Sequence, residues 1–169
     1  VVPKDKYGNP LLRAVYKFIM TILVLKKEEA DIIHINASFP YDIFVGISAK
    51  VAGIPYVIFH SHNSNMSSSN RMKKLLMPLC KVFIPYVSDC NLACSESAAN
   101  FMFPDKILRE HNYTILKNGI YSSKFLYNAD IREQSRAKWS LKRNYVIGHV
   151  GRFTEQKNHR FLLEVFREI

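Results

Sequence analysis

Two hydrophobic patterns alternate along the first 118 residues of the chain. Apolar residues recur at helical spacing after Asn9-Pro10, where proline suits the first turn of a helix, and this helix is expected to end near residues 26–29. Helical patterns also span about residues 41–52 and 71–87, and Ser95 is a suitable N-cap for a further short helix. Between the helices lie short apolar runs of the kind found in parallel strands covered on both faces. They occupy residues 31–36, 55–59, 90–94 and 113–116.

Strands that alternate with helices predict an α/β protein with a doubly wound, Rossmann-like parallel sheet. In such sheets ligands bind beyond the carboxyl ends of the strands. Several polar segments are expected at these ends, and because they follow different strands they predict a binding site at one edge of the sheet. These segments are residues 60–63 at the start of a Ser/Asn-rich loop (60–70), Ser95-Glu96, a turn at Asn118-Gly119, and Gly151-Arg152.

The end of the chain predicts the start of a second domain. Residues 145–150 have the pattern of a buried strand, residues 151–158 form a basic loop, and residues 159–169 have the pattern of an amphipathic helix. A lone strand and helix cannot bury their apolar faces, so we expect this unit to belong to a further sheet in a longer protein. The expected organisation is a partial first domain over residues 1–118, a linker over 119–144 with one short helix near 131–139, and the start of a second Rossmann-like domain over 145–169.

Composition adds a charge argument to this α/β assignment. Of 169 residues, 48% are hydrophobic and 22% are charged, which is typical of globular chains, and the formal net charge is +10. The excess of cations favours a polyanionic partner, unless other parts of a longer protein supply compensating acids. Three cysteines at Cys80, Cys90 and Cys94 lack metal-site spacing and indicate reduced thiols. The apolar run at 18–25 is too short to span a bilayer.

Two groups of residues are candidates for chemistry. Arg152 and Lys157 lie in a strand-to-helix loop, where fixed cations and helix amides favour phosphate; the alternative is two solvated surface cations. His60 and His62 follow a strand, and we expect them to point to opposite sides, so that one ring faces the cleft and donates a hydrogen bond to a ligand while the other packs. A purely structural histidine pair is the alternative there.

Three segments carry a family resemblance. Residues 150–158 (VGRFTEQKN) resemble the segment that opens the C-terminal domain of GT4-type retaining glycosyltransferases, which have the GT-B fold. Residues 115–120 (ILKNGI), followed by Phe125, resemble the linker segment of that family, with Lys117 in place of its usual proline. Residues 59–63 (FHSHN) resemble the HSHN segment of members that build polysaccharides. The three segments occur in the family's order and at similar spacing.

The resemblance implies a function and a set of site residues. It implies transfer of a sugar from a nucleotide donor, expected to be UDP-linked, to a lipid-linked glycan in capsular or exopolysaccharide biosynthesis, with retention and with neither a metal nor a cofactor. Gly151, Arg152 and Lys157 would hold the donor diphosphate, and His62 would lie near the reacting sugar. Further candidates are His60, Asn63, Asn118 and Gly119. The family's E-x7-E pair and its Gly-rich first loop are not in this chain, so we expect little catalysis from the chain alone.

Two other functions stay open at this point, together with a membrane contact. An epimerase-like enzyme of the same fold would also process nucleotide sugars, and a basic nucleic-acid-binding module is suggested by charge alone, without its usual motifs, so nucleic acid is not the expected partner. The segment of residues 71–77 mixes cations with bulky apolar groups, so it could lie on an anionic membrane or form an ordinary core helix. The expected location is the cytoplasm, with peripheral contact at the inner membrane face.

Overall fold

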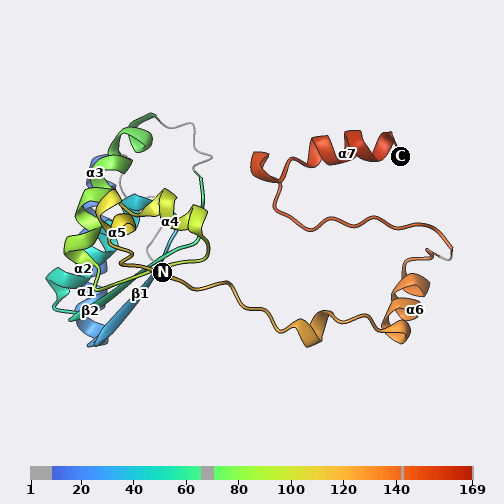
Figure 1. Cartoon of the computed structure of the whole chain (residues 1–169), viewed down its shortest axis with the longest axis horizontal. Coiled ribbons are helices and arrows are strands. Elements are labelled where there is room, and N and C mark those ends of the chain that lie inside the picture. Colours follow the sequence, from blue (N-terminus) through green and yellow to red (C-terminus); the bar gives the residue numbers. More distant parts are fainter. Residues whose placement is uncertain (1–8, 66–70, 142, 169) are drawn as a thin grey trace. The chain divides into compact units, whose positions relative to one another are not determined.

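The computed structural model describes residues 9–65, 71–141 and 143–168 (Figure 1). The chain divides into two compact units, Val1–Asn118 and Gly119–Ile169, which we call unit 1 and unit 2. The distal part of the loop predicted at 60–70 lies outside the described residues.

Unit 1 contains a four-stranded parallel sheet in the order β1-β2-β3-β4. The predicted alternation of strands and helices is therefore confirmed, and with it the α/β class of the fold. The strands are β1 (Ile32–Ala37), β2 (Tyr56–Ser61), β3 (Cys90–Ala93) and β4 (Thr114–Ile115). The helices are α1 (Pro10–Glu28), α2 (Ile43–Ala52), α3 (Arg71–Val87), α4 (Glu96–Met102) and α5 (Asp105–Arg109), with a 3-10 turn, η1, at Pro40–Asp42.

Local sequence signals set the ends of these helices. Gly53 ends α2 in the left-handed region with φ of 93°, and its N–H donates to the carbonyls of Ala49 and Lys50. The Ser95 side chain accepts a hydrogen bond from the Ala98 N–H and so caps α4.

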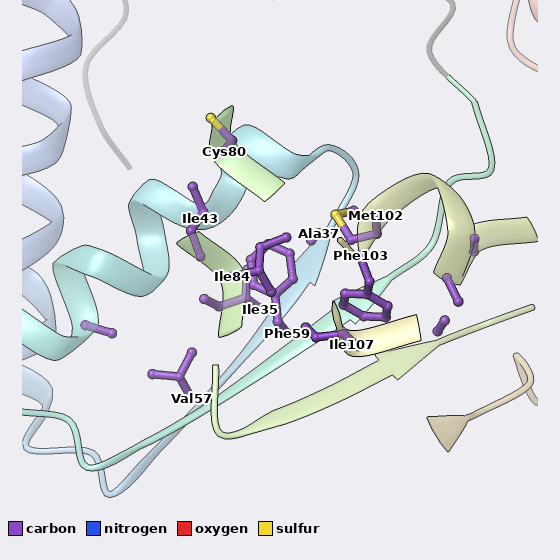
Figure 2. Packing of buried hydrophobic residues seen from close by; sticks show 14 of the residues in the cluster. Ile35, Ala37, Ile43, Val57, Phe59, Cys80, Ile84, Met102, Phe103 and Ile107 are labelled. Atoms are coloured by element: carbon purple, nitrogen blue, oxygen red, sulfur yellow. The ribbon is translucent and has the colours of Figure 1, made fainter. Parts of the chain in front are cut away.

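One face of the sheet in unit 1 carries the hydrophobic core. Consecutive parallel strands that wind in one direction through right-handed crossovers place α2, α3 and α4 on the same face, and Figure 2 shows apolar side chains of the sheet and these helices packed together. Side chains therefore alternate along β1 and β2: Ile35 and Phe59 are buried, whereas Ile32 and Tyr56 are exposed. The buried apolar side chains are Ile35, Ala37, Ile43, Ala49, Ile54, Val57, Phe59, Cys80, Ile84, Ala93, Ala98, Ala99, Met102, Phe103 and Ile107.

Asp89 ties the amino-terminal ends of β2 and β3 to α2. Its carboxylate accepts hydrogen bonds from the Val57 N–H at 2.7 Å and from Lys50 Nζ at 2.6 Å. These two contacts, with Lys50 the stronger, lower the pKa of Asp89. The register of the two strands is thus fixed at the edge opposite to the one where a ligand is expected.

Unit 2 consists of short helices and irregular segments. Its elements are η2 (Ser122–Phe125), α6 (Ala129–Lys138), η3 (Glu155–Lys157) and α7 (His159–Arg167). The predicted short helix near 131–139 and the predicted helix from 159 are thus confirmed as α6 and α7.

The buried strand predicted at residues 145–150 is wrong for this chain. These residues form no strand, and Tyr145 and Val150 are 104% and 99% exposed. The physical reason is that a strand is defined by a hydrogen-bonded neighbour, and none of the strands of the described chain pairs with this segment. The turn predicted at Asn118-Gly119 is also wrong, because both residues lie in an irregular segment and Gly119 does not adopt positive φ.

Candidate functional site

A row of polar side chains lies at the carboxyl ends of β1 and β2. We call it the histidine row, and it consists of His34, Asn36, His60 and His62. Residues two apart on a strand share a face, and β1 and β2 pair in a register that sets Asn36 opposite His60. The row therefore occupies the face of the sheet away from the apolar core, at the edge where ligands bind in α/β proteins.

The expectation that His60 and His62 point to opposite sides is wrong. Their ring centroids lie 4.1 Å apart, as residues i and i+2 of an extended segment require. The loop predicted from residue 60 also begins later than expected, because β2 continues through His60 to Ser61. The two histidines therefore act as neighbours on one surface.

His60 is the buried member of the row. It is 5% exposed, its Nδ1 lies 3.1 Å from Nε2 of His34, and the two rings stack with centroids 5.3 Å apart. Burial lowers the pKa of His60, and the positive charges that His62 and His34 carry when protonated lower it further; the backbone of Leu116 acts in the opposite direction. Nε2 of His60 has no hydrogen-bond partner among the described residues. His60 is therefore a neutral packing element at neutral pH.

We expect the stability of unit 1 to fall on mild acidification because of His60. Its lowered pKa means that the unfolded chain binds a proton at a pH where the folded chain does not, so the free energy of unfolding decreases as pH drops below about 6.5, the ordinary histidine value. Urea unfolding of wild type and of His60→Gln between pH 5 and pH 8 measures this, and the glutamine variant should show a shallower dependence on pH. Equal pH dependence in both proteins would contradict the assignment.

His62 follows β2 and is held from both neighbouring strands. Its backbone N–H donates to the Ala37 carbonyl of β1 at 3.1 Å. Its backbone carbonyl accepts a contact of 3.7 Å from Sγ of Cys94, which lies just after β3. Its ring is half-buried, and Nε2 lies 2.9 Å from Oδ1 of Asn36. A histidine fixed by backbone and side chain at the ligand-binding edge can present its remaining ring nitrogen to a bound molecule.

The other predicted residues of this edge have separate environments. Asn63 is half-buried directly after His62. Ser95 caps α4, and the Glu96 carboxylate accepts a hydrogen bond of 2.8 Å from the Tyr113 hydroxyl. Asn118 and Gly119 are exposed beyond β4.

The predicted phosphate-binding residues form a compact loop in unit 2. Gly151 and Arg152 are exposed and lead into η3, which ends at Lys157. A Cβ atom at Gly151 would lie 3.3 Å from Cγ of Lys157, so the lysine stem packs directly over the glycine. Asn158 then adopts the left-handed region with φ of 41° and caps α7 through the Phe161 N–H. The loop thereby brings Gly151 next to Lys157 at the start of a helix.

Three aromatic rings at this loop and one amide in unit 1 were not predicted from the sequence. The His159 ring lies 4.9 Å from the His149 ring and 4.7 Å from the Phe153 ring. A signal was available, because the two histidines flank the basic loop. Asn36 was also missed, although its spacing from His34 matches that of His60 and His62.

The described residues contain neither a metal-binding cluster nor a membrane-spanning helix. In residues 9–65, 71–141 and 143–168, no group of three or more His, Cys, Asp or Glu side chains is arranged to hold a metal ion. No helix in this described part is both long enough and apolar enough to cross a membrane. The metal-free and cofactor-free site inferred from the resemblance stays a prediction.

Comparisons with known proteins show that the chain is similar to glycosyltransferases. It is 28% identical over 97% of its length to "Putative glycosyltransferase EpsF" of Bacillus subtilis, covering 42% of that protein. It is 26% identical over 94% of its length to an Escherichia coli galactosyltransferase, named for UDP-Gal and α-D-GlcNAc-diphosphoundecaprenol, of which it covers 41%. It is also 26% identical over 88% of its length to the capsular polysaccharide glycosyltransferase CapM of Staphylococcus aureus, covering 40%. No family model matches the chain.

A solved structure supports the fold independently. The crystal structure of Anabaena HepE in complex with UDP matches 95% of this chain and 43% of its own, with a TM-score of 0.66 and 14% sequence identity. The chain thus spans about two fifths of the proteins that it matches. The resemblance to glycosyltransferases is confirmed: along nearly its whole length, this chain is similar to proteins named as glycosyltransferases, one of them for capsular polysaccharide biosynthesis.

Proposed function

We propose that the chain is part of a retaining glycosyltransferase that moves a sugar from a UDP-linked donor to a lipid-linked glycan in capsule or exopolysaccharide synthesis. The observation that carries this proposal is the match of almost the entire chain to three curated glycosyltransferases, one of them named for capsular polysaccharide biosynthesis. Since one relative is named for a UDP-sugar and a polyprenyl-diphosphate acceptor, both substrate classes are reasonable for the whole protein. The same names favour transfer over an epimerase or a nucleic-acid-binding module.

The loop of unit 2 supplies the electrostatics that departure of a diphosphate requires. When the bond from the anomeric carbon to the diphosphate breaks, negative charge builds on the leaving oxygen. A bond to the acceptor oxygen forms on the same face of the sugar, and the acceptor hydroxyl gives its proton to the departing diphosphate. Arg152 and Lys157 are exposed cations without a carboxylate partner among the described ion pairs, so their charge is available to the diphosphate. Fixed cations can stabilise this charge, and we propose that no metal and no cofactor takes part.

His62 is the proposed contact to the reacting sugar from unit 1. Its backbone is anchored to β1 and to the residue after β3, so its ring position is set by the sheet rather than by a loose loop. His60 and Asn63 flank it, with His60 as packing support and Asn63 as a further polar group at the same edge.

A transfer assay on the whole protein tests this function. The protein is incubated with radiolabelled UDP-hexoses and membranes that carry polyprenyl-linked glycans; label is expected in the lipid fraction, with the anomeric configuration of the donor kept in the product. Because the chain spans about two fifths of its relatives and lacks an E-x7-E pair, the 169-residue chain in parallel is expected to transfer no sugar. Whole protein that neither binds UDP nor transfers label would refute the proposal.

We also propose a cytoplasmic location with peripheral contact at the inner membrane face. On α3, Leu75 and Tyr86 are 76% and 75% exposed, Leu79 is 56% exposed, and Lys74 lies exposed beside them. Together with the net charge of +10, this combination suits an anionic bilayer surface. Sedimentation with anionic vesicles should retain the protein at low salt, and Leu75→Ser should weaken retention; equal binding to neutral vesicles would contradict the electrostatic part.

A further inference from the structure

The side chain of Asn36 in β1 contacts the ring of His62, the residue that follows β2, through one hydrogen bond. Nε2 of His62 lies 2.9 Å from Oδ1 of Asn36, although the two residues are 26 positions apart in the sequence. An amide oxygen can only accept a hydrogen bond, whereas a ring nitrogen of neutral imidazole either donates or accepts. A neutral His62 that bonds to this oxygen must donate, and it then carries its proton on Nε2 and its lone pair on Nδ1.

The remainder of the histidine row keeps this ring in place. The His60 ring lies 4.1 Å from the His62 ring by centroid, and His60 is itself held by the 3.1 Å contact to His34. A half-turn of the His62 ring about its Cβ–Cγ bond would put the ring carbon Cε1 where Nε2 now contacts Asn36, so this hydrogen bond would be lost while the ring stayed packed against the buried His60. Packing against His60 thus holds the ring in place, and the hydrogen bond to Asn36 selects its orientation.

We propose that Asn36 is a positioning residue that keeps His62 protonated on Nε2 and so makes Nδ1 a hydrogen-bond acceptor. With Nε2 engaged by Asn36, a neutral His62 has no N–H left to donate to a phosphate oxygen, but Nδ1 can accept from a hydroxyl. The ring would therefore recognise a hydroxyl of the donor sugar or acceptor, in contrast to the ligand-directed donor expected from the sequence. This consequence for substrate rests on the proposed function, whereas the protonation of the ring does not.

Nitrogen NMR of ¹⁵N-histidine-labelled protein tests the proposal without any ligand. At pH 8, where an ordinary imidazole is neutral, His62 should show a protonated Nε2 and an unprotonated Nδ1, with its signals identified by their loss in His62→Gln. In Asn36→Leu the form protonated on Nδ1 should become populated. Asn36→Asp should restore the wild-type pattern, because a carboxylate also accepts from Nε2.

The control is Asn100→Ala, which removes the same side chain from an exposed site on α4. Its His62 signals should match those of wild type. A wild-type His62 protonated on Nδ1, or an Asn36→Leu variant with an unchanged pattern, would overturn the proposal. The wild-type spectrum alone shows which nitrogen of His62 carries the proton, even where a variant fails to fold.

A binding experiment tests the hydroxyl preference separately. At pH 8, His62→Phe in the whole protein should bind UDP within about twofold of wild type and UDP-glucose about 2- to 10-fold more weakly, as expected for loss of one neutral hydrogen bond. An equal loss for UDP and UDP-glucose would show that His62 contacts the diphosphate. If wild type binds neither UDP nor UDP-glucose, the proposed function is refuted. The NMR experiment still decides whether Asn36 sets the protonation of His62, because it uses no ligand.

Discussion

Replacing Lys157 with alanine in the whole protein is expected to slow sugar transfer by about 2 to 4 kcal/mol of transition-state stabilisation, or roughly 30- to 1000-fold. Lys157 is exposed, and its stem packs over Gly151 at the start of α7, so its ammonium group is placed by the loop without being needed for folding. In the alanine variant, the negative charge that develops on the leaving diphosphate would be stabilised by one fixed cation fewer. Steady-state kinetics with the UDP-sugar donor measures the effect on kcat and on kcat/KM.

Two comparisons make the Lys157 result specific. Lys138→Ala removes an exposed lysine at the end of α6, in the same unit, and should leave transfer unchanged. Gly151→Ala keeps the cation but crowds its stem, because the new Cβ would lie 3.3 Å from Cγ of Lys157 and 3.0 Å from Nε2 of His149. It should give an intermediate loss. Wild-type kcat and KM in a folded Lys157→Ala protein would remove this residue from the donor site.

Replacing Phe59 with alanine is expected to destabilise unit 1 by about 3 to 5 kcal/mol, the usual cost of emptying a buried phenylalanine site. Phe59 lies in the centre of β2, is 0% exposed, and packs among the core side chains of the sheet and helices (Figure 2). Urea unfolding followed by circular dichroism gives the free energy of unfolding. This loss is a large fraction of the total, since small domains have only about 5 to 15 kcal/mol of stability.

Phe125→Ala is the matched comparison for the core prediction. Phe125 is 75% exposed in η2, so the same change of side chain removes little buried area and should alter the unfolding of unit 1 by less than about 0.5 kcal/mol. Similar losses of stability in the two variants would show that Phe59 is not the centre of the core.

Much of the site could be located from sequence because its parts follow strands. The apolar runs marked the strands, and the residues directly after them, such as His62 and Ser95, had to lie at the carboxyl edge of a parallel sheet. The prediction that His60 and His62 point to opposite sides was wrong, although the two-residue period of a strand is sufficient to place both rings on one side. The strand predicted at 145–150 was wrong for a different reason. An apolar run indicates only that a segment favours the extended conformation, whereas a strand also needs a neighbouring strand to pair with.

The sequence by itself determined the order of the strands and main helices of unit 1, the cap at Ser95, and the motifs that resemble those of glycosyltransferases. These features are local, so a few neighbouring residues encode them. Only the tertiary structure decided that Asn36 meets His62, that His34 meets His60, and that His60 is buried. The physical reason is that each of these contacts depends on the register of β1 against β2, which is set by the packing of residues distant in sequence.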